Sequence, residues 1–209
     1  MKIKLLTALA VLATAGVVSA NIMVPNGDFE TAGGADWNSA SGPGGAFSYP
    51  ASGGNPGGYG QMDSAAGDWA VFVATDGSGT GNELIPLSYF GLGLAAGDTI
   101  TVEMDMIQFS GDAGETAGLK MESWTTGGVI SDSGDVKLAV AASWTTYSWD
   151  YTIAAGATHL KFVPVQHNGL SVGYDNVGVV PEPATMGLLA LSGGFMMLIR
   201  RFRRHYRIG

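Results

Sequence analysis

Hydrophobic and polar residues alternate along several short segments in the middle of the chain. Residues 99–106 and 147–153 carry apolar side chains at every second position, and Leu160 and Phe162 continue this pattern further along. A period of two is typical of half-buried antiparallel strands. Shorter apolar segments predict further strands at Ala70–Thr75, Leu119–Trp124, Val136–Val140 and Ser171–Val179. Many short strands separated by Gly, Asn, Asp and Ser predict an all-β, two-sheet sandwich.

Two segments break this pattern. Residues 39–60 are rich in Gly, Pro and Ser and include Phe47, Tyr49 and Tyr59, so we expect a long surface loop there. Every second residue of Asp76–Gly81 is glycine, which predicts a second, flexible loop. Neither segment ends in Lys-Ser/Thr or precedes a predicted helix, which excludes a phosphate-binding loop.

The N-terminus has the three parts of a secretory signal peptide. Lys2 and Lys4 form a positive segment, Leu5–Val18 is apolar, and small side chains follow it. Such a segment directs export and is removed by signal peptidase. We therefore assign residues 1–20 to the signal peptide and expect the mature protein to begin at Asn21.

A second apolar segment lies near the C-terminus. Residues 184–199 contain no charged side chain, and a basic cluster at 200–207 follows, with Arg200, Arg201, Arg203 and Arg204. As a helix the apolar segment spans about 25 Å, slightly less than a hydrocarbon core of about 30 Å. Long arginine side chains make up this difference, so we predict a transmembrane helix. Because Lys and Arg favour the cytoplasmic side, both basic ends stay inside and residues 21–180 lie outside the cytoplasm.

The predicted exported domain is strongly acidic. Residues 21–180 contain seventeen Asp and Glu against three Lys, a net charge of −14, whereas both ends of the chain are basic. This charge repels nucleic acid and anionic lipid, and it suits neutral ligands, cations or solubility alone. The chain contains no cysteine, which excludes thiol catalysis and zinc–thiolate sites. An exported domain without disulfides depends for its stability on core burial or on a bound ion.

The order of features at the C-terminus resembles the PEP-CTERM sorting signal. Pro181, Glu182 and Pro183 precede the apolar helix, and the arginine cluster follows it, so that the resemblance covers residues 181–209. It implies cleavage near the motif by an exosortase, a membrane peptidase of Gram-negative bacteria that also make exopolysaccharide. It further implies delivery to the cell surface or the extracellular matrix. The two prolines oppose helix formation, which keeps the motif extended and accessible just outside the bilayer.

Three further motifs resemble jelly-roll carbohydrate-binding modules of the galactose-binding-like class: Asn26-Gly27-Asp28-Phe29-Glu30, Ala96-Gly97-Asp98-Thr99-Ile100 and Gly173-Tyr174-Asp175-Asn176-Val177. The resemblance implies that the sandwich is a jelly roll whose first and last strands lie close together. It also implies a structural calcium ion held by Glu30 and Asp175, with Asp28 as a weaker ligand, because carboxylate oxygens suit this ion. Alternatively, Asp28 forms an Asx turn and the other two carboxylates are solvated charges at strand ends.

Aromatic residues outside the alternating segments are candidates for sugar contacts. Trp37, Tyr49, Tyr59 and Trp124 fall in loops or at strand ends, where a flat ring can stack on a sugar. Alternatively, these rings cap the edges of the sandwich.

Motifs for catalysis are weak. Gly169–Gly173 matches the G-x-S-x-G nucleophile pattern, but a strand-like segment follows it in place of a helix, and the only later histidine is His205. His159 and His167 lack metal-ligand spacing. We therefore predict an exported, non-catalytic surface or matrix protein and a candidate for exopolysaccharide binding. The alternatives are a structural or adhesive surface protein without glycan binding, and a glycan-processing enzyme.

Overall fold

The computed structural model describes residues 21–31, 34–41, 45–64, 69–111, 116–167 and 169–180, with the side chains of all except 39–41, 69 and 70. The expected signal peptide and the expected sorting tail, residues 181–209, lie outside these residues. Asn21–Val180 forms one compact unit. Within the described ranges, no helix is long and apolar enough to cross a membrane.

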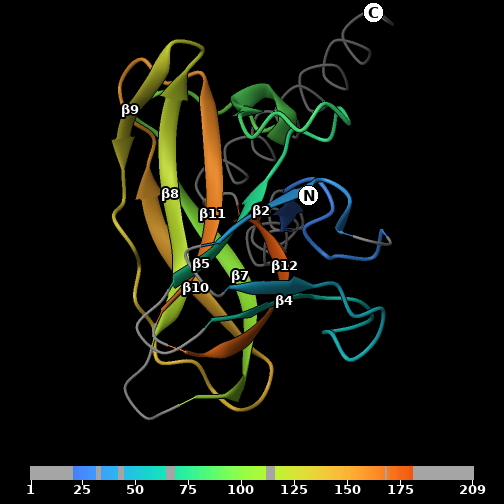
Figure 1. Cartoon of the computed structure of the whole chain (residues 1–209). Coiled ribbons are helices and arrows are strands. Elements are labelled where there is room, and N and C mark those ends of the chain that lie inside the picture. Colours follow the sequence, from blue (N-terminus) through green and yellow to red (C-terminus); the bar gives the residue numbers. More distant parts are fainter. Residues whose placement is uncertain are drawn as a thin grey trace, which may run out of the picture. The chain divides into compact units, whose positions relative to one another are not determined.

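Two antiparallel sheets face each other across one core (Figure 1). The first is called the terminal sheet because it holds the first and last strands. Its strands lie in the order β10 (Thr145–Thr152), β7 (Thr99–Ser110), β12 (Ser171–Val180), β4 (Gly60–Asp63) and β3 (Ala46–Ser48). The short strand β1 (Ile22–Met23) also pairs with β12. The second is called the facing sheet. Its strands lie in the order β2 (Trp37–Ser41), β5 (Trp69–Ala74), β11 (His159–His167), β8 (Ala117–Thr125) and β9 (Gly128–Asp132). The short strand β6 (Ile85–Pro86) also pairs with β11. The short 3-10 helix η2 (Leu87–Phe90) follows β6.

The alternating pattern of the sequence produces these sheets. On β7, Ile100, Val102, Met104 and Met106 are at most 1% exposed, whereas the residues between them, apart from Asp105, keep partial contact with solvent. On the facing sheet, β8 and β11 direct their own alternate apolar residues into the same core: Leu119, Met121, Leu160 and Phe162. The predicted all-β sandwich is therefore confirmed, and burial of these side chains is its main source of stability.

The first and last strands are neighbours, as the jelly-roll resemblance implied. Ile22 lies opposite Val179, and Met23 lies opposite Gly178, in an antiparallel pair. Because β12 also pairs with β7 and β4, the last strand lies in the interior of the terminal sheet.

Two expectations about local structure were wrong. Val136–Val140 is not a strand, because only Leu138 forms a bridge, to Ala117. The segment instead runs irregularly along β8 after β9, with backbone hydrogen bonds from Val136 to Leu119 at 3.3 Å and from Leu138 to Ala117 at 2.9 Å. It lies so close that a Cβ added to Gly118 would be 1.7 Å from the Val136 carbonyl oxygen. Residues 39–60 are not one long surface loop, since they contain β3 and pack Phe47 and Tyr49 against the core.

Candidate functional site

Carboxylates hold the loop of residues 50–59 against the outer face of the terminal sheet. Asp175 Oδ2 accepts a hydrogen bond from the backbone N–H of Asn55 at 2.6 Å, and Asp105 Oδ2 accepts one from the Asn55 side-chain amide at 3.1 Å. Glu30 Oε1 accepts a third from the backbone N–H of Gly58 at 3.0 Å. Three carboxylates from distant parts of the sequence therefore contact one glycine-rich loop.

Two members of this carboxylate cluster are deeply buried. Asp105 and Asp175 lie opposite each other on β7 and β12 and are 5% and 0% exposed. Burial raises the pKa of Asp175 to about 7; backbone hydrogen bonds from Asn55 and Asn176 oppose this rise, and the charges of Asp105 and Glu30 add to it. Within the described part of the chain, none of the ion pairs involves these carboxylates. The cluster therefore holds negative charge that no described cationic side chain neutralises.

Two of the three residues expected to bind calcium belong to this cluster. Glu30 and Asp175 contact the same loop, whereas Asp28 Oδ1 accepts a hydrogen bond from the Glu30 backbone N–H at 3.3 Å, as in an Asx turn. Among the described residues, no group of three or more His, Cys, Asp or Glu side chains is arranged to hold a metal ion. The donor chemistry nevertheless suits a hard cation, because the cluster offers carboxylate oxygens beside loop carbonyls.

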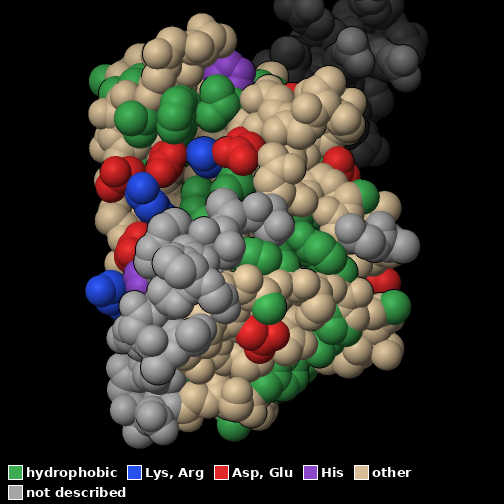
Figure 2. All heavy atoms as spheres, in the orientation of Figure 1, with side chains coloured by type: hydrophobic (Ala, Val, Ile, Leu, Met, Phe, Trp, Pro, Cys, Tyr) green, Lys and Arg blue, Asp and Glu red, His purple; other side chains and the backbone are tan. Residues whose placement is uncertain are grey.

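A second group of residues lies on the outer face of the facing sheet and is called the Trp124 face. Its first row runs across four strands, where Val129, Trp124, His159 and Pro86 are successive neighbours. The next row contains Asp132, Glu122 and Lys161. Figure 2 shows acidic and basic side chains as a band across the surface above β8 and β11.

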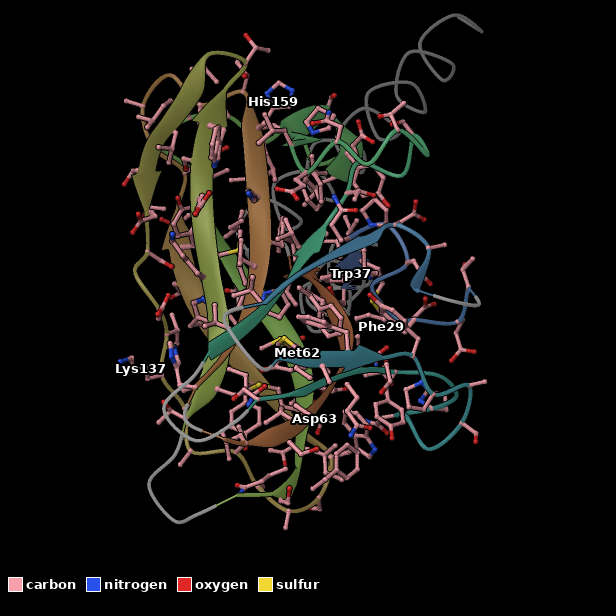
Figure 3. All side chains as sticks on the ribbon, viewed as in Figure 1. Phe29, Trp37, Met62, Asp63, Lys137 and His159 are labelled. Carbon is pink, nitrogen blue, oxygen red and sulfur yellow. The ribbon has the colours of Figure 1, made fainter. Side chains whose placement is uncertain are left out.

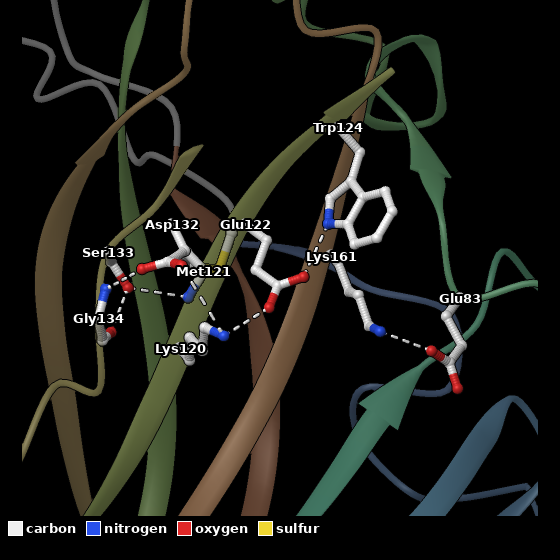
Figure 4. Close-up of polar contacts among 9 residues, drawn as sticks. All are labelled: Glu83, Lys120, Met121, Glu122, Trp124, Asp132, Ser133, Gly134 and Lys161. Carbon is white, nitrogen blue, oxygen red and sulfur yellow. Dashed lines mark hydrogen bonds and ion pairs between the residues drawn. The ribbon is translucent and has the colours of Figure 1, made fainter. Parts of the chain in front are cut away.

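Polar contacts fix the orientation of the Trp124 ring (Figure 4). The indole N–H donates to Glu122 Oε2 at 2.7 Å, and the Lys161 ammonium lies 5.6 Å from the ring centroid. Lys161 Nζ pairs with Glu83 at 2.7 Å, and Lys120 Nζ pairs with Glu122 at the same distance. Contacts from β8, β11 and the loop that carries Glu83 thus hold a half-buried tryptophan among charged side chains.

These ion pairs keep the Trp124 face charged. Burial alone raises the pKa of Glu83, but hydrogen bonds from Lys161 and Asn38 and the Lys161 charge outweigh it, so the pKa is lowered. The hydrogen bond to Glu122 raises the pKa of Lys120 despite the opposing effect of burial. The face therefore combines an aromatic ring with fixed hydrogen-bond donors and acceptors, a chemistry that suits a polyhydroxylated ligand.

The other aromatic candidates occupy different environments. Trp37 is 6% exposed and stacks on Phe29 with ring centroids 4.8 Å apart, and its N–H donates to the Asn26 carbonyl (Figure 3). Tyr49 packs on Phe72 at 5.5 Å, and burial raises the pKa of its hydroxyl. Neither Trp37 nor Tyr49 presents a ring as Trp124 does, because Trp37, at the start of β2, lies in the core and Tyr49, after β3, packs against it.

Tyr59 lies on the terminal sheet, away from Trp124. Its ring centroid is 5.6 Å from that of Phe109 and 5.6 Å from that of Trp144. Ser171, the serine of the G-x-S-x-G match, begins β12, and its hydroxyl accepts a hydrogen bond from Gln61 at 3.1 Å. The segment is therefore a strand and not a strand–turn–helix nucleophile motif.

The sequence pattern did not identify several residues of both sites. Asp105, Glu122 and Lys161 occupy polar positions of alternating strands, where a solvated charge is the ordinary expectation. Strand pairing places Glu122 opposite Lys161 and Asp105 opposite Asp175, and these pairings bring the residues into the two sites.

Comparisons with known proteins identify the fold. No protein-family model and no curated protein sequence matches the chain. The CBM22-2 xylan-binding domain of Xyn10C from Paenibacillus barcinonensis has a TM-score of 0.51 at 13% identity, over 77% of this chain and 99% of that chain. The enzymatically active domain of tailspike protein 4 from bacteriophage CBA120 has a TM-score of 0.57 at 12% identity, over 77% of this chain and only 21% of that chain. Arabinose-bound MgGH51 α-L-arabinofuranosidase has a TM-score of 0.51 at 14% identity, over 81% and 27% of the two chains. The fold is thus the jelly roll found in carbohydrate-binding modules.

Proposed function

We propose that this is an exported protein that binds polysaccharide without catalysis, through the Trp124 face. The observation that carries this proposal is the fixed Trp124 ring, whose N–H is bonded to Glu122 and whose neighbours are charged side chains. A flat ring stacks on the apolar face of a sugar, and the surrounding acceptors and donors bind its hydroxyls. The name of the similar Xyn10C domain, a xylan-binding domain, supports this class of ligand.

The carboxylates of the Trp124 face support binding in preference to hydrolysis. Glycoside hydrolysis needs one carboxyl group that exchanges a proton with the substrate and a second that acts as base or nucleophile. Here Glu122 is paired with Lys120 and Glu83 with Lys161, each at 2.7 Å. Both carboxylates are therefore occupied by ion pairs, and the pKa of Glu83 is lowered by Lys161 and Asn38 against the effect of burial, which suits a hydrogen-bond acceptor and not a proton donor.

A glycan array with the full-length protein and its Trp124→Ala variant tests this function. We expect the wild type to bind neutral polysaccharides, and the variant to bind at least about tenfold more weakly, equivalent to about 1.4 kcal/mol. Trp124→Phe retains a ring and is expected to keep most of the affinity. Equal binding by wild type and Trp124→Ala would reject the proposed face. Self-association without glycan binding would favour a structural or adhesive protein, and glycan cleavage a glycan-processing enzyme.

Export and sorting complete the proposed function. The signal-peptide pattern of residues 1–20 and the order of proline motif, apolar segment and arginines after Val180 support export. The resemblance to PEP-CTERM signals supports processing by an exosortase and delivery to the surface or matrix of a Gram-negative bacterium. The acidic charge of residues 21–180 is compatible with neutral polysaccharide as a partner and opposes nucleic acid.

A structural calcium ion is part of this proposal. Glu30 and Asp175 would hold it, and its charge would offset the buried negative charge of the carboxylate cluster. The raised pKa of Asp175 supports this assignment, because it reflects carboxylates placed together in a buried position.

A further inference from the structure

We propose that the sandwich is bivalent, with a second polysaccharide-binding surface on the outer face of the terminal sheet. This surface, called the Phe109 face, is formed by Phe109 and Trp144, and the buried Tyr59 ring packs against both. The inference rests on the proposed function but concerns a different sheet from the one that carries Trp124.

Three elements bring the rings of the Phe109 face together. Phe109 lies near the end of β7, Trp144 directly precedes β10, and Tyr59 directly precedes β4. The Tyr59 ring centroid lies 5.6 Å from each of the other two. Aromatic pairs at this distance attract each other, which fixes the three rings as one group.

Gly173 of β12 forms the floor beneath these rings. A Cβ added there would lie 2.9 Å from Ile107 Cγ2, 3.0 Å from Trp144 Cη2 and 3.1 Å from Phe109 Cε2. The side chains therefore lie directly against the backbone of β12. Any larger residue at this position would push them off the sheet, so glycine is required for a low, continuous aromatic surface.

The fold accounts for two of these rings but not for the third. The Trp144 N–H donates to the Gly53 carbonyl at 2.8 Å, and Tyr59 is 9% exposed, so both help to hold the loop of residues 50–59. Phe109 is 45% exposed and is not among the side chains of the core. The exposed Phe109 ring beside the fixed Trp144 and Tyr59 rings forms a flat aromatic group, the kind of surface on which a sugar stacks.

Polar groups border the rings on the side of β4. The Gln61 amide donates to both carboxylate oxygens of Asp63 at 3.2 Å and to the Ser171 hydroxyl at 3.1 Å. The Tyr59 hydroxyl contacts Gln61 Oε1 at 3.4 Å. Rings beside an amide, a hydroxyl and a carboxylate repeat the chemistry of the Trp124 face.

The negative charge of the Phe109 face and of the whole domain favours a neutral polysaccharide as the ligand of this face. Asp63 is the charged member of this group, and none of the described ion pairs brings a lysine or histidine to it. A nucleic acid, an anionic lipid or a polyuronate would be repelled, both here and by the net charge of the domain. A neutral sugar chain can stack on the rings and bond the polar groups without pairing a charge.

Two binding surfaces on opposite sheets would allow one molecule to bridge two polysaccharide strands. Linking strands in this way requires both faces at once, whereas simple binding requires only one. The full-length protein and its variants can be compared with soluble xylan and an array of neutral polysaccharides, measuring affinity and, by turbidity, cross-linking.

We expect Trp124→Ala to leave weak binding that the double variant with Phe109→Ala reduces to background. Phe109→Ala alone should keep tight binding, but its cross-linking activity should fall at least tenfold. Phe109→Tyr, which retains a ring, should keep the cross-linking activity. Tyr89→Ala, which removes a ring of similar exposure (42%) on η2, serves as the matched control and should behave as wild type.

The results separate this inference from the proposed function. Complete loss of binding in Trp124→Ala, or unchanged cross-linking by Phe109→Ala, would overturn bivalency while leaving the Trp124 face intact. A wild-type protein that binds no polysaccharide would overturn both.

Discussion

The carboxyl group of Asp175 links pH to the stability of the sandwich. Its pKa is raised to about 7 in the folded protein, mainly by burial and further by the charges of Asp105 and Glu30. An unfolded aspartate has a pKa of about 3.9, so between these two values the folded state holds one proton more than the unfolded state. The contribution of this group to stability is therefore full at low pH and is lost as the pH rises towards 7.

This difference predicts that the free energy of unfolding, measured in chelator, falls between about pH 5 and about pH 7. The slope should approach about 1.4 kcal/mol per pH unit for one proton. Denaturant titrations of the full-length protein measure it, and Asp175→Asn should flatten it. Asp150→Asn, an exposed substitution on the same sheet, should leave the slope unchanged.

Calcium would reverse this trend, because binding requires the ionised carboxylate. Added calcium should raise the melting temperature more at pH 7.5 than at pH 5.5 in the wild type. A melting temperature unaffected by chelator at pH 7.5 would refute the calcium assignment.

Trp37 illustrates how a candidate binding residue becomes a core residue. Its ring stacks on Phe29 and meets Phe72 edge-on with centroids 6.0 Å apart. Trp37→Ala should therefore lower the free energy of unfolding by about 3–5 kcal/mol, as for other large core residues. Urea unfolding measures this loss. If Trp37→Ala instead weakened glycan binding with unchanged stability, its placement in the core would be wrong.

At the scale of elements, the two-residue period of β8 places Lys120, Glu122 and Trp124 next to one another on the outer face of the facing sheet. Glu122 on β8 bonds the Trp124 indole at 2.7 Å, while its other oxygen pairs with Lys120. We predict that Glu122→Ala lowers polysaccharide affinity about 3- to 10-fold, since a net hydrogen bond contributes about 0.5–1.5 kcal/mol. Glu122→Gln keeps an acceptor for the indole and should lose less. Equal affinities for Glu122→Ala and wild type in glycan titrations would show that the ring needs no such support.

Long strands such as β7 were predictable from alternation and Trp124, Glu30 and Asp175 from residue type and motif, whereas the short strands and the partners of these residues were not. β7 and β10 show the two-residue period over most of their length, and Leu160 and Phe162 show it on β11. Val136–Val140 shows the same period, but the segment runs irregularly along β8, close to Gly118, and forms only one bridge. The glycine-rich sequence around β3 gave no strand pattern. Periodicity also could not predict which aromatic side chains outside the alternating segments pack in the core, or that Asp105 lies opposite Asp175. Those facts depend on strand order, which local pattern does not encode.

At the scale of the whole molecule, the basic N-terminal and C-terminal segments determine how we expect the protein to be exported and processed. Export followed by exosortase cleavage predicts a mature protein that begins at Asn21 and ends near Pro181. Intact mass spectrometry of protein from its native host measures both ends. A C-terminus at Gly209 would instead indicate a retained membrane anchor, and a retained Met1 would contradict signal-peptide removal.

The pairing of β1 with β12 has a consequence for how such a domain can be built into other proteins. Ile22 and Val179 lie opposite each other, so the chain enters and leaves the sandwich at one place. A domain with adjacent ends can be inserted into a surface loop of another protein without forcing that loop apart. Residues 21–180 are therefore suited to grafting as a cassette, or to circular permutation with a new opening at the loop Asp76–Gly81.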